Sequence, residues 1–355
     1  MSLMSAMEGK TPSKFVNGRF VNPWDTWREP SVRAGVRFMC MANQGGGPPT
    51  ERELDRTLPV LPPECSKLST SPPSGVNVTW IGHASLLVQF DGISILTDPI
   101  FSSFCGPHWL VGYKRFRPVP FGIRDLHTMV PRMHAVVISH THYDHLDLPT
   151  VVELNKWYGR HLRWFVPRGV KDWFTRTGVE NVVELDWWQE NCIKLDGKTE
   201  VTFAFTPSQH WSQRTAIDRQ KSLWGSWSVI GPNHSFFFAG DTGYCKAFKE
   251  IGQRYGPFDV AAIPIGAYIP RDFLSPQHVD PSQAVQIHLD VRAKQSVAIH
   301  WGTFQLGKEA YLAPREDLKT ALNEKGLSDR NFLTLKHGET RLLGAEEEDG
   351  IAGDA

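Results

Sequence analysis

The chain has 355 residues, of which 41% are hydrophobic and 21% are charged, and this composition excludes wholesale disorder. Lysine plus arginine equals aspartate plus glutamate at 38 each, which argues against a nucleic-acid-binding protein. No apolar stretch approaches the roughly 20 residues that cross a bilayer, and the N-terminus lacks the apolar core of a secretory signal. The five cysteines are widely spaced and form no CxxC, which indicates reduced thiols in an intracellular protein that faces the cytosol.

The N-terminal residues 1–75 are rich in proline, glycine, serine and charge, and predict an extended arm with little regular structure. One exception is 31–42, where Val32, Val36 and Met39 follow helical spacing beside two arginines. This segment predicts either a short helix packed on the body or a basic, apolar helix that contacts a membrane.

A layered α/β domain is predicted over residues 76–343. Short apolar runs predict buried strands, and Asp91-Gly92 is typical of a tight hairpin turn between two of them. The predicted strands are 77–81, 85–90, 93–97, 135–139, 163–166, 201–206, 227–230, 235–240, 259–264 and 296–300. Helices are predicted at 148–158, 246–256, 280–291 and 313–326, from proline or aspartate starts and glycine ends. Alternation of strands and helices indicates helices on the outer faces of sheets.

The last twelve residues, 344–355, carry five acids and no base, and predict a disordered tail. Without them the chain has a formal charge of +5. A mildly cationic body either sits against anionic lipid or simply keeps the protein soluble.

Metal-binding chemistry is concentrated in the segment HTHYDHLD, directly after the apolar run 135–139. Because side chains at i and i+2 point the same way in extended backbone, His140 and His142 can meet one metal, while Asp144 and His145 face a neighbouring position. Imidazole with carboxylate suits Zn²⁺, with Fe or Mn as alternatives. Three more polar residues stand at predicted strand ends and complete a two-metal set: His210, Asp241 and His300.

The other histidines show no such pattern, and most are predicted to be structural or on the surface. They are His83, His108, His127, His134, His161, His234, His288 and His337. His278 differs, because it lies in a polar loop before a predicted helix and is expected near the site.

The sequence around these residues resembles that of the N-acyl-phosphatidylethanolamine-hydrolysing phospholipases D, a family within the metallo-β-lactamase superfamily. The resemblance runs from about residue 18 to 342 and fails at the N-terminus, around 40–75 and in the tail. The motifs that carry it include GRFVNPW, TWIGHAS, LTDPIFSS, KRFRP, TPSQHW, FFFAGDTGYC, QHVDP, SVAIHWGTF and LKHGE.

This resemblance implies a four-layer αβ/βα sandwich with two zinc ions per chain at the edge between the sheets. It implies that His140, His142 and His210 hold one zinc, that Asp144, His145 and His300 hold the other, and that Asp241 bridges them. A hydroxide between two zincs would attack the phosphodiester, giving N-acylethanolamine and phosphatidate. Asp241 and His278 are thus expected to be catalytic, and Tyr143 and His278 to contact substrate.

The family further implies a homodimer, peripheral on the cytosolic face of membranes, with Golgi or endosomal membranes as candidates. It also has a bile-acid site; here residues 213–217 and Gln305 lie in the right region but match only partly. No nucleic-acid partner is expected.

Two smaller features have open interpretations. Asp98, after the strand 93–97, either accepts a hydrogen bond from a ligand histidine or caps a turn. Lys114, Arg115 and Arg117 either meet lipid phosphates or form a solvated basic turn.

Three rival functions remain. Another phosphodiesterase of this fold, acting on nucleic acid or cyclic nucleotide, would need a basic track, whereas this chain is neutral with 13 Trp and 20 Phe. An amidase could cut the acyl–nitrogen bond with the same metals. A non-catalytic lipid-binding protein would have lost the metal, and the intact ligand spacing argues against it.

Overall fold

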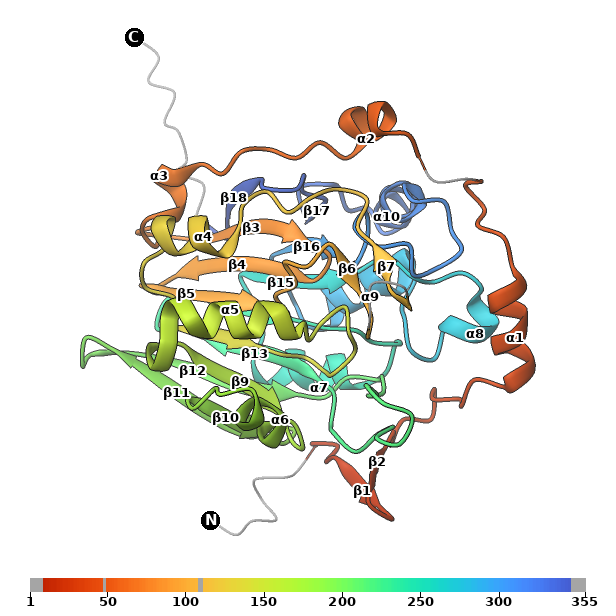
Figure 1. Cartoon of the computed structure of the whole chain (residues 1–355), viewed down its shortest axis with the longest axis horizontal. Coiled ribbons are helices and arrows are strands. Elements are labelled where there is room, and N and C mark those ends of the chain that lie inside the picture. Colours follow the sequence, from red (N-terminus) through yellow and green to blue (C-terminus); the bar gives the residue numbers. More distant parts are fainter. Residues whose placement is uncertain (1–8, 47–48, 108–110, 346–355) are drawn as a thin grey trace.

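The computed structural model describes residues 9–46, 49–107 and 111–345 of the chain (Figure 1). Two seven-stranded sheets pack face to face, and helices cover their outer faces. The expected four-layer αβ/βα sandwich is therefore the fold of the described residues.

The first sheet has the strand order β10-β9-β8-β5-β4-β3-β18. Its strands β5, β8, β9 and β10 are parallel, and β3, β4, β5 and β18 pair antiparallel with their neighbours. Asp91 and Gly92 join β4 to β5 with φ of 46° and 80°, as a tight primed turn requires, so the hairpin prediction is confirmed. The bounds are β3 (Val76–Gly82), β4 (Ser85–Phe90), β5 (Ile93–Thr97), β8 (Ala135–Val137), β9 (Arg163–Pro167), β10 (Val182–Leu185) and β18 (Thr340–Leu343).

The second sheet has the order β11-β12-β13-β14-β15-β16-β17. Strands β11 to β14 are antiparallel neighbours, and β14 to β17 run parallel. The bounds are β11 (Glu190–Leu195), β12 (Thr199–Thr206), β13 (Ser226–Ile230), β14 (Ser235–Phe238), β15 (Val260–Pro264), β16 (Gln295–Ile299) and β17 (Phe332–Leu333).

Alternate side chains of each strand serve two different cores, as the pleat of a strand requires. In β4, Leu86 joins the core between the sheets with Phe203 and Trp227, whereas Leu87 joins the core beneath the outer helices. The helices over the first sheet are α4 (Ile123–Met129), α5 (Leu148–Tyr158) and α6 (Lys171–Arg176), with a 3₁₀ turn at Gly159–His161. The helices that follow strands of the second sheet in the chain are α7 (Ala247–Arg254), α8 (Arg271–Leu274), α9 (Pro281–Asp290) and α10 (Ala313–Glu324).

Helix starts follow the sequence signals closely. Asp147 caps α5 by accepting from the backbone N–H of Thr150 (3.3 Å), and Asp280 caps α9 by accepting from that of Gln283 (2.9 Å). Proline follows within the first turn of each.

The N-terminal segment has more regular structure than the sequence predicted. It contains β1 (Lys14–Val16), β2 (Arg19–Val21), α1 (Val32–Cys40), α2 (Glu51–Thr57) and α3 (Cys65–Leu68). It also lies against the body, because Trp24 is buried and its indole donates to the carbonyl of Ser208 (3.0 Å). A division at residue 76 stays a prediction, and the acidic residues 346–355 lie outside the described residues.

The predicted helix at 31–42 is confirmed as α1. Its Phe38 ring stacks on Phe273 of α8 with the ring centres 5.0 Å apart, and Arg37 pairs with Asp272 of the same helix at 2.8 Å. No residue of α1 is buried, and Val32 and Met39 are 85% and 73% exposed. One side of α1 therefore contacts α8, whereas its side chains Val32 and Met39 remain exposed to solvent.

The KRFRP segment was expected to form a solvated turn or to meet lipid, and neither holds for its arginines. Arg115 is buried and donates to the carbonyls of Ile100 (2.8 Å) and Ile81 (3.3 Å). Arg117 pairs with Glu51 and Asp55 of α2 at 3.1 and 2.7 Å. Lys114 is exposed in the small hairpin of β6 (Phe104–Cys105) and β7 (Tyr113–Lys114).

Among the described residues, no helix combines the length and the apolar character that crossing a bilayer needs.

Candidate metal centre

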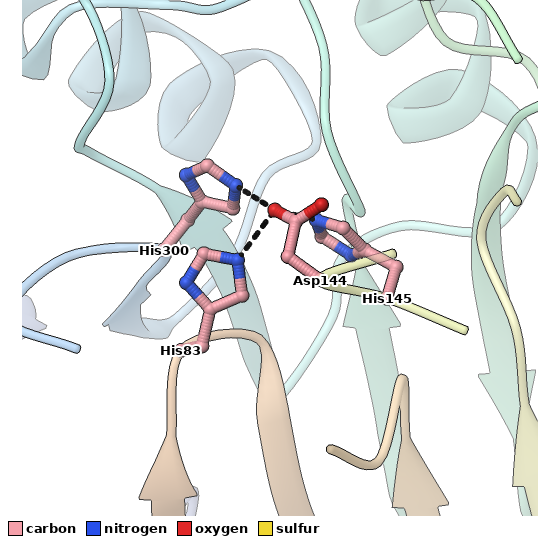
Figure 2. A group of neighbouring side chains, drawn as sticks. All are labelled: His83, Asp144, His145 and His300. Atoms are coloured by element: carbon pink, nitrogen blue, oxygen red, sulfur yellow. Dashed lines mark hydrogen bonds and ion pairs between the residues drawn. The ribbon is translucent and has the colours of Figure 1, made fainter. Parts of the chain in front are cut away.

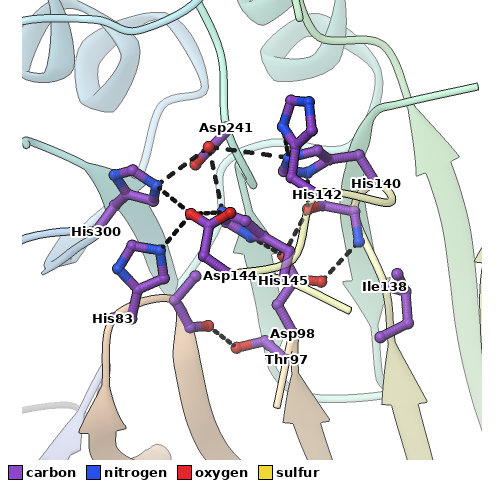
Figure 3. Close-up of polar contacts among 12 residues, drawn as sticks. His83, Thr97, Asp98, Ile138, His140, His142, Asp144, His145, Asp241 and His300 are labelled. Carbon is purple, nitrogen blue, oxygen red and sulfur yellow. Dashed lines mark hydrogen bonds and ion pairs between the residues drawn. The ribbon is translucent and has the colours of Figure 1, made fainter. Parts of the chain in front are cut away.

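One edge of the sandwich gathers the polar residues that follow the strands of both sheets. In the first sheet, β3, β5 and β8 run in the same direction and end at this edge, as do β12, β14 and β16 in the second. All seven predicted metal-binding residues meet there, and Figure 3 labels all of them except His210. They are His140, His142, Asp144 and His145 after β8, His210 after β12, Asp241 after β14 and His300 after β16.

Three imidazoles form the first group of this cluster. Nε2 of His140 lies 2.8 Å from Nδ1 of His142, and Nε2 of His210 lies 3.1 Å from the same atom. Lone pairs of several imidazoles pointing at one place are the arrangement that a metal ion stabilises.

The second group consists of Asp144, His145 and His300. Oδ2 of Asp144 lies 3.2 Å from Nε2 of His145 and 3.4 Å from Nε2 of His300. Asp241 stands between the two groups, since its Oδ2 is 3.2 and 3.1 Å from Nε2 of His145 and His300, and 3.9 and 3.8 Å from those of His140 and His210. This geometry suits a carboxylate shared by two metal positions.

The far side of two of the rings is held by a protein acceptor, which fixes their tautomer. Nδ1 of His145 donates to Asp98 Oδ2 at 2.6 Å, and Nδ1 of His210 donates to the carbonyl of Gln277 at 2.9 Å. Both rings therefore present an unprotonated Nε2 to the cluster when neutral. Of the two interpretations of Asp98, the acceptor for a clustered histidine is confirmed, and Asp98 is fully buried.

Burial and charge divide the histidines into two classes. Burial lowers the pKa of His210 to about 3 and that of His142 to about 4, which leaves both as neutral imidazoles. Burial also disfavours charge on His300, but the carboxylates of Asp241 and Asp144 outweigh it and raise its pKa to about 9. The space between the two carboxylates thus favours positive charge.

Unpartnered buried atoms show that this residue set fits metal ions. Among the described residues, His142 Nε2, Asp241 Oδ1 and His300 Nδ1 are buried without a hydrogen-bond partner, and Nε2 of His145 and of His300 contacts carboxylate oxygens at 3.1–3.4 Å without hydrogen-bond geometry. Polar atoms are rarely left so at the centre of a protein, because desolvation without a partner costs about 1–3 kcal/mol each. The cluster can therefore bind metal.

Sequence reasoning missed one member of the cluster. His83 was expected to be structural or on the surface, but it is 1% exposed and its Nε2 lies 2.9 Å from Oδ2 of Asp144 (Figure 2). It follows Gly82, where β3 ends at the same edge. The signal was the one used for His210 and His300, a polar residue at a strand end, but it was not applied to the strand that ends at Gly82.

The two predicted substrate contacts border the cluster. Nδ1 of His278 lies 3.9 Å from Oδ2 of Asp241, and its side chain is 14% exposed. Tyr143 donates its hydroxyl to the carbonyl of Arg214 at 2.9 Å, and the Arg214 guanidinium lies 4.2 Å from its ring centre. His278 therefore borders the cluster directly, whereas the hydroxyl of Tyr143 is engaged with the loop of Arg214.

A cleft of about 780 Å³ opens beside the histidine-bearing loop and gives Tyr143 access to solvent. Its wall includes Phe104, Leu148, Trp173 and Arg214. The cleft thus combines apolar surface with an arginine next to the candidate metal centre.

Two of the side chains expected near a bile-acid site are engaged within the protein, whereas Ile217 of the same set is 74% exposed. Arg214 donates to the carbonyls of Thr141 and Leu146, and the Gln305 amide donates to those of Gly307 and Glu309 at 2.9 Å each. The bile-acid site stays a prediction.

Comparison with known proteins places the chain in a family. The profile described as Beta-lactamase superfamily domain matches residues 94–301, which is more than half of the chain. "N-acyl-phosphatidylethanolamine-hydrolyzing phospholipase D 1" of Caenorhabditis elegans is 41% identical over 306 residues, covering 82% of each chain. A yeast protein, "N-acyl-phosphatidylethanolamine-hydrolyzing phospholipase D, mitochondrial" of Saccharomyces cerevisiae, is 34% identical and covers 89% of this chain and 74% of its own.

A solved structure supports the fold independently. Igni18, a metallo hydrolase of the archaeon Ignicoccus hospitalis, superposes with a TM-score of 0.56 at 22% identity, over 76% of this chain and 98% of its own. The family resemblance and the metallo-β-lactamase fold predicted from the sequence are both confirmed. The chain belongs to the family of N-acyl-phosphatidylethanolamine-hydrolysing phospholipases D of the β-lactamase superfamily, and it is accordingly a phosphodiester hydrolase.

Proposed function

We propose that this enzyme is a zinc-dependent phospholipase D that hydrolyses N-acyl-phosphatidylethanolamine to N-acylethanolamine and phosphatidate. The observation that carries the proposal is the position of Asp241 between two groups of ligand-type side chains, in a chain of this family.

In this proposal His140, His142 and His210 hold one zinc, Asp144, His145 and His300 hold the other, and Asp241 contacts both. Zinc bound there would supply Lewis acidity, which neutralises phosphodiester charge and lowers the pKa of water.

The protein's own part is to orient ligands and substrate. Asp98 and the carbonyl of Gln277 hold the rings of His145 and His210 from behind, so that Nε2 of each faces inward. His278 borders Asp241, and its Nδ1 has no hydrogen-bond partner in the part of the chain that the structure describes, which places it to hydrogen-bond a phosphate oxygen. Tyr143 lines the adjoining cleft, whose apolar wall suits the lipid part of the substrate.

The membrane setting is part of the same proposal. We propose peripheral binding on the cytosolic face of a membrane, with N-acyl-phosphatidylethanolamine as the lipid partner. A homodimer, a bile-acid ligand and a Golgi or endosomal location remain predictions of family resemblance. The yeast relative is named a mitochondrial protein.

Hydrolysis in ¹⁸O-water tests which bond is cut. With N-acyl-phosphatidylethanolamine in micelles, mass spectrometry should find the label in the phosphate of phosphatidate and none in the N-acylethanolamine. Label in a free fatty acid would mean amide cleavage, and label in the ethanolamine hydroxyl would mean carbon–oxygen cleavage. Either outcome would overturn attack at phosphorus. Absence of turnover with this lipid alongside turnover of another phosphodiester would favour a different phosphodiesterase.

A further inference from the structure

We infer that His83 is a positioning residue that holds the Asp144 carboxylate in place for the second metal position. The inference rests on the two-metal part of the proposed function and does not depend on which phosphodiester is cut. It begins from the 2.9 Å contact between His83 Nε2 and Asp144 Oδ2 (Figure 2).

The direction of this hydrogen bond follows from the two groups. Asp144 can bind a metal only as a carboxylate, and a carboxylate accepts hydrogen bonds but has no proton to donate. His83 Nε2 must therefore carry the proton. Nδ1 of His83 is buried and has no hydrogen-bond partner among the described residues, so the ring makes one polar contact, and that contact is Asp144.

The backbone of His83 is fixed from both sheets, which makes the ring a rigid support. Its N–H donates to Oγ1 of Thr303 (2.6 Å), and its carbonyl accepts from the N–H of His300 (3.1 Å) and the indole of Trp80 (3.0 Å). It has a φ of 56°, a left-handed conformation that is uncommon for residues other than glycine, although histidine adopts it more often than most. The rings of His83 and His300 lie 4.1 Å apart between centroids. His83 thus connects the loop of Asp144 to the strand end of His300.

A hydrogen-bonding role accounts for His83 better than direct metal binding. Asp144, His145, His300 and the shared Asp241 already supply four protein ligands to the second position. A catalytic zinc keeps a coordination position open for water or substrate, and a fifth protein ligand would fill it. A ring that holds a ligand carboxylate leaves that position free.

Loss of the His83 donor should therefore weaken one metal site and spare the other. Removing the hydrogen-bond partner of a metal ligand typically lowers metal affinity about 10–100-fold. The first group, His140, His142 and His210, has its own supports and should keep its affinity.

The test titrates metal-free, full-length protein with Zn²⁺ against a chromophoric chelator. Wild type should bind two equivalents. His83→Phe, which keeps an aromatic ring without a donor, should bind one equivalent as wild type does and the second about 10–100-fold more weakly. His83→Gln places an amide N–H near the position of Nε2 and should recover much of the loss.

A remote substitution separates positioning from general damage. His288 of α9 is also buried, with 3% of its surface exposed, and its ring forms a hydrogen bond with Oγ of Ser296 in β16 (2.8 Å). His288→Phe should lower the melting temperature of the metal-free protein as His83→Phe does, while both zinc affinities stay unchanged.

Three outcomes would decide against the inference or its basis. Equal second-site affinity in wild type and His83→Phe would overturn it. Complete loss of the second equivalent in both His83→Phe and His83→Gln would make His83 a ligand instead. Fewer than two equivalents in wild type would instead contradict the two-metal proposal itself.

Discussion

At the scale of single residues, one carboxylate oxygen organises the candidate centre. Asp241 Oδ2 lies between 3.1 and 3.9 Å from a ring nitrogen of each of five histidines: His140, His145, His210, His278 and His300. Asp241 is 3% exposed, so its charge is compensated by protein groups and, in our proposal, by the two zincs.

Asp241→Asn should abolish most turnover, because an amide cannot supply the charge that two metals share. We expect a fall in kcat of more than about 100-fold, beyond the range seen when only a supporting partner is removed. Elemental analysis should show about two zincs in wild type and fewer in the variant. Near wild-type turnover in Asp241→Asn would contradict the bridging role, and iron as the dominant metal would contradict zinc.

Asp98→Asn provides a graded comparison, since Asp98 touches His145 and not the candidate metal positions. The variant keeps an acceptor oxygen but loses its charge, so zinc affinity should fall about 10–100-fold. Chelator competition measures this. A loss as large as that of Asp241→Asn would mean that the fold at the strand end has collapsed, which circular dichroism of the same sample would reveal.

His278→Ala should separate substrate contact from metal binding. His278 borders Asp241 at 3.9 Å but lies outside both groups of three. We expect kcat/KM to fall while the zinc content stays at the wild-type value. Loss of one zinc would move His278 among the metal ligands.

At the scale of elements, the loop between β8 and α5 depends on one side chain from the loop after β12. Nη1 of Arg214 donates to the carbonyls of Thr141 (2.9 Å) and Leu146 (2.6 Å), which flank His142, Asp144 and His145. The guanidinium also lies over the rings of Tyr143 and Trp173. Arg214 therefore joins the two ends of this loop.

Arg214→Met should loosen the loop because two carbonyls lose a charged donor. The expected cost is about 3 kcal/mol in the free energy of unfolding, together with weaker zinc binding. Chemical denaturation and zinc titration measure the two effects. Arg168→Met is the comparison, since Arg168 pairs with Asp186 at a half-exposed site and should cost less than about 1 kcal/mol. Equal effects of both variants would contradict a special role of Arg214.

At the scale of the whole molecule, the exposed apolar side chains of α1 offer a contact for a lipid surface. Val32, Val36 and Met39 are 85%, 49% and 73% exposed, and Arg33 lies on the same short helix. Apolar side chains beside basic ones on a surface helix favour binding to anionic membranes.

Val32→Asp combined with Met39→Asp should reduce binding to anionic vesicles at least about tenfold, since it removes apolar area and adds negative charge. Vesicle sedimentation measures this. Turnover of a monomeric short-chain phosphodiester should stay unchanged, because α1 contributes none of the clustered residues. Unchanged vesicle binding would mean that another surface meets the lipid.

Much of the molecule follows from local sequence. Helices α5, α7, α9 and α10 begin and end within a few residues of their predicted limits, because proline, aspartate caps and terminal glycines act over one turn. The central strands can be recognised in the same way, because a strand buried on both faces is a continuous run of apolar residues. The residues of HTHYDHLD are neighbours in the chain, so their convergence is visible without a fold.

Other features depend on contacts that no local pattern carries. The edge strands β10, β11 and β18 are short or half polar, so their pairing is decided by the sheets that they extend. The regular elements before residue 76 form because Trp24 and Leu54 find apolar partners on the body.

The sequence by itself determined the fold class and seven side chains of the centre, since strand ends and ligand types can be recognised locally. Only the tertiary structure decided that His83 joins them and that Arg115 is buried, with its guanidinium on the carbonyls of Ile81 and Ile100. His83 and Asp144 are 61 positions apart and meet because β3 and β8 run in the same direction to one edge. The physical reason is that a lone histidine or arginine in a sequence carries no sign of its partner, which only the packing of distant strands supplies.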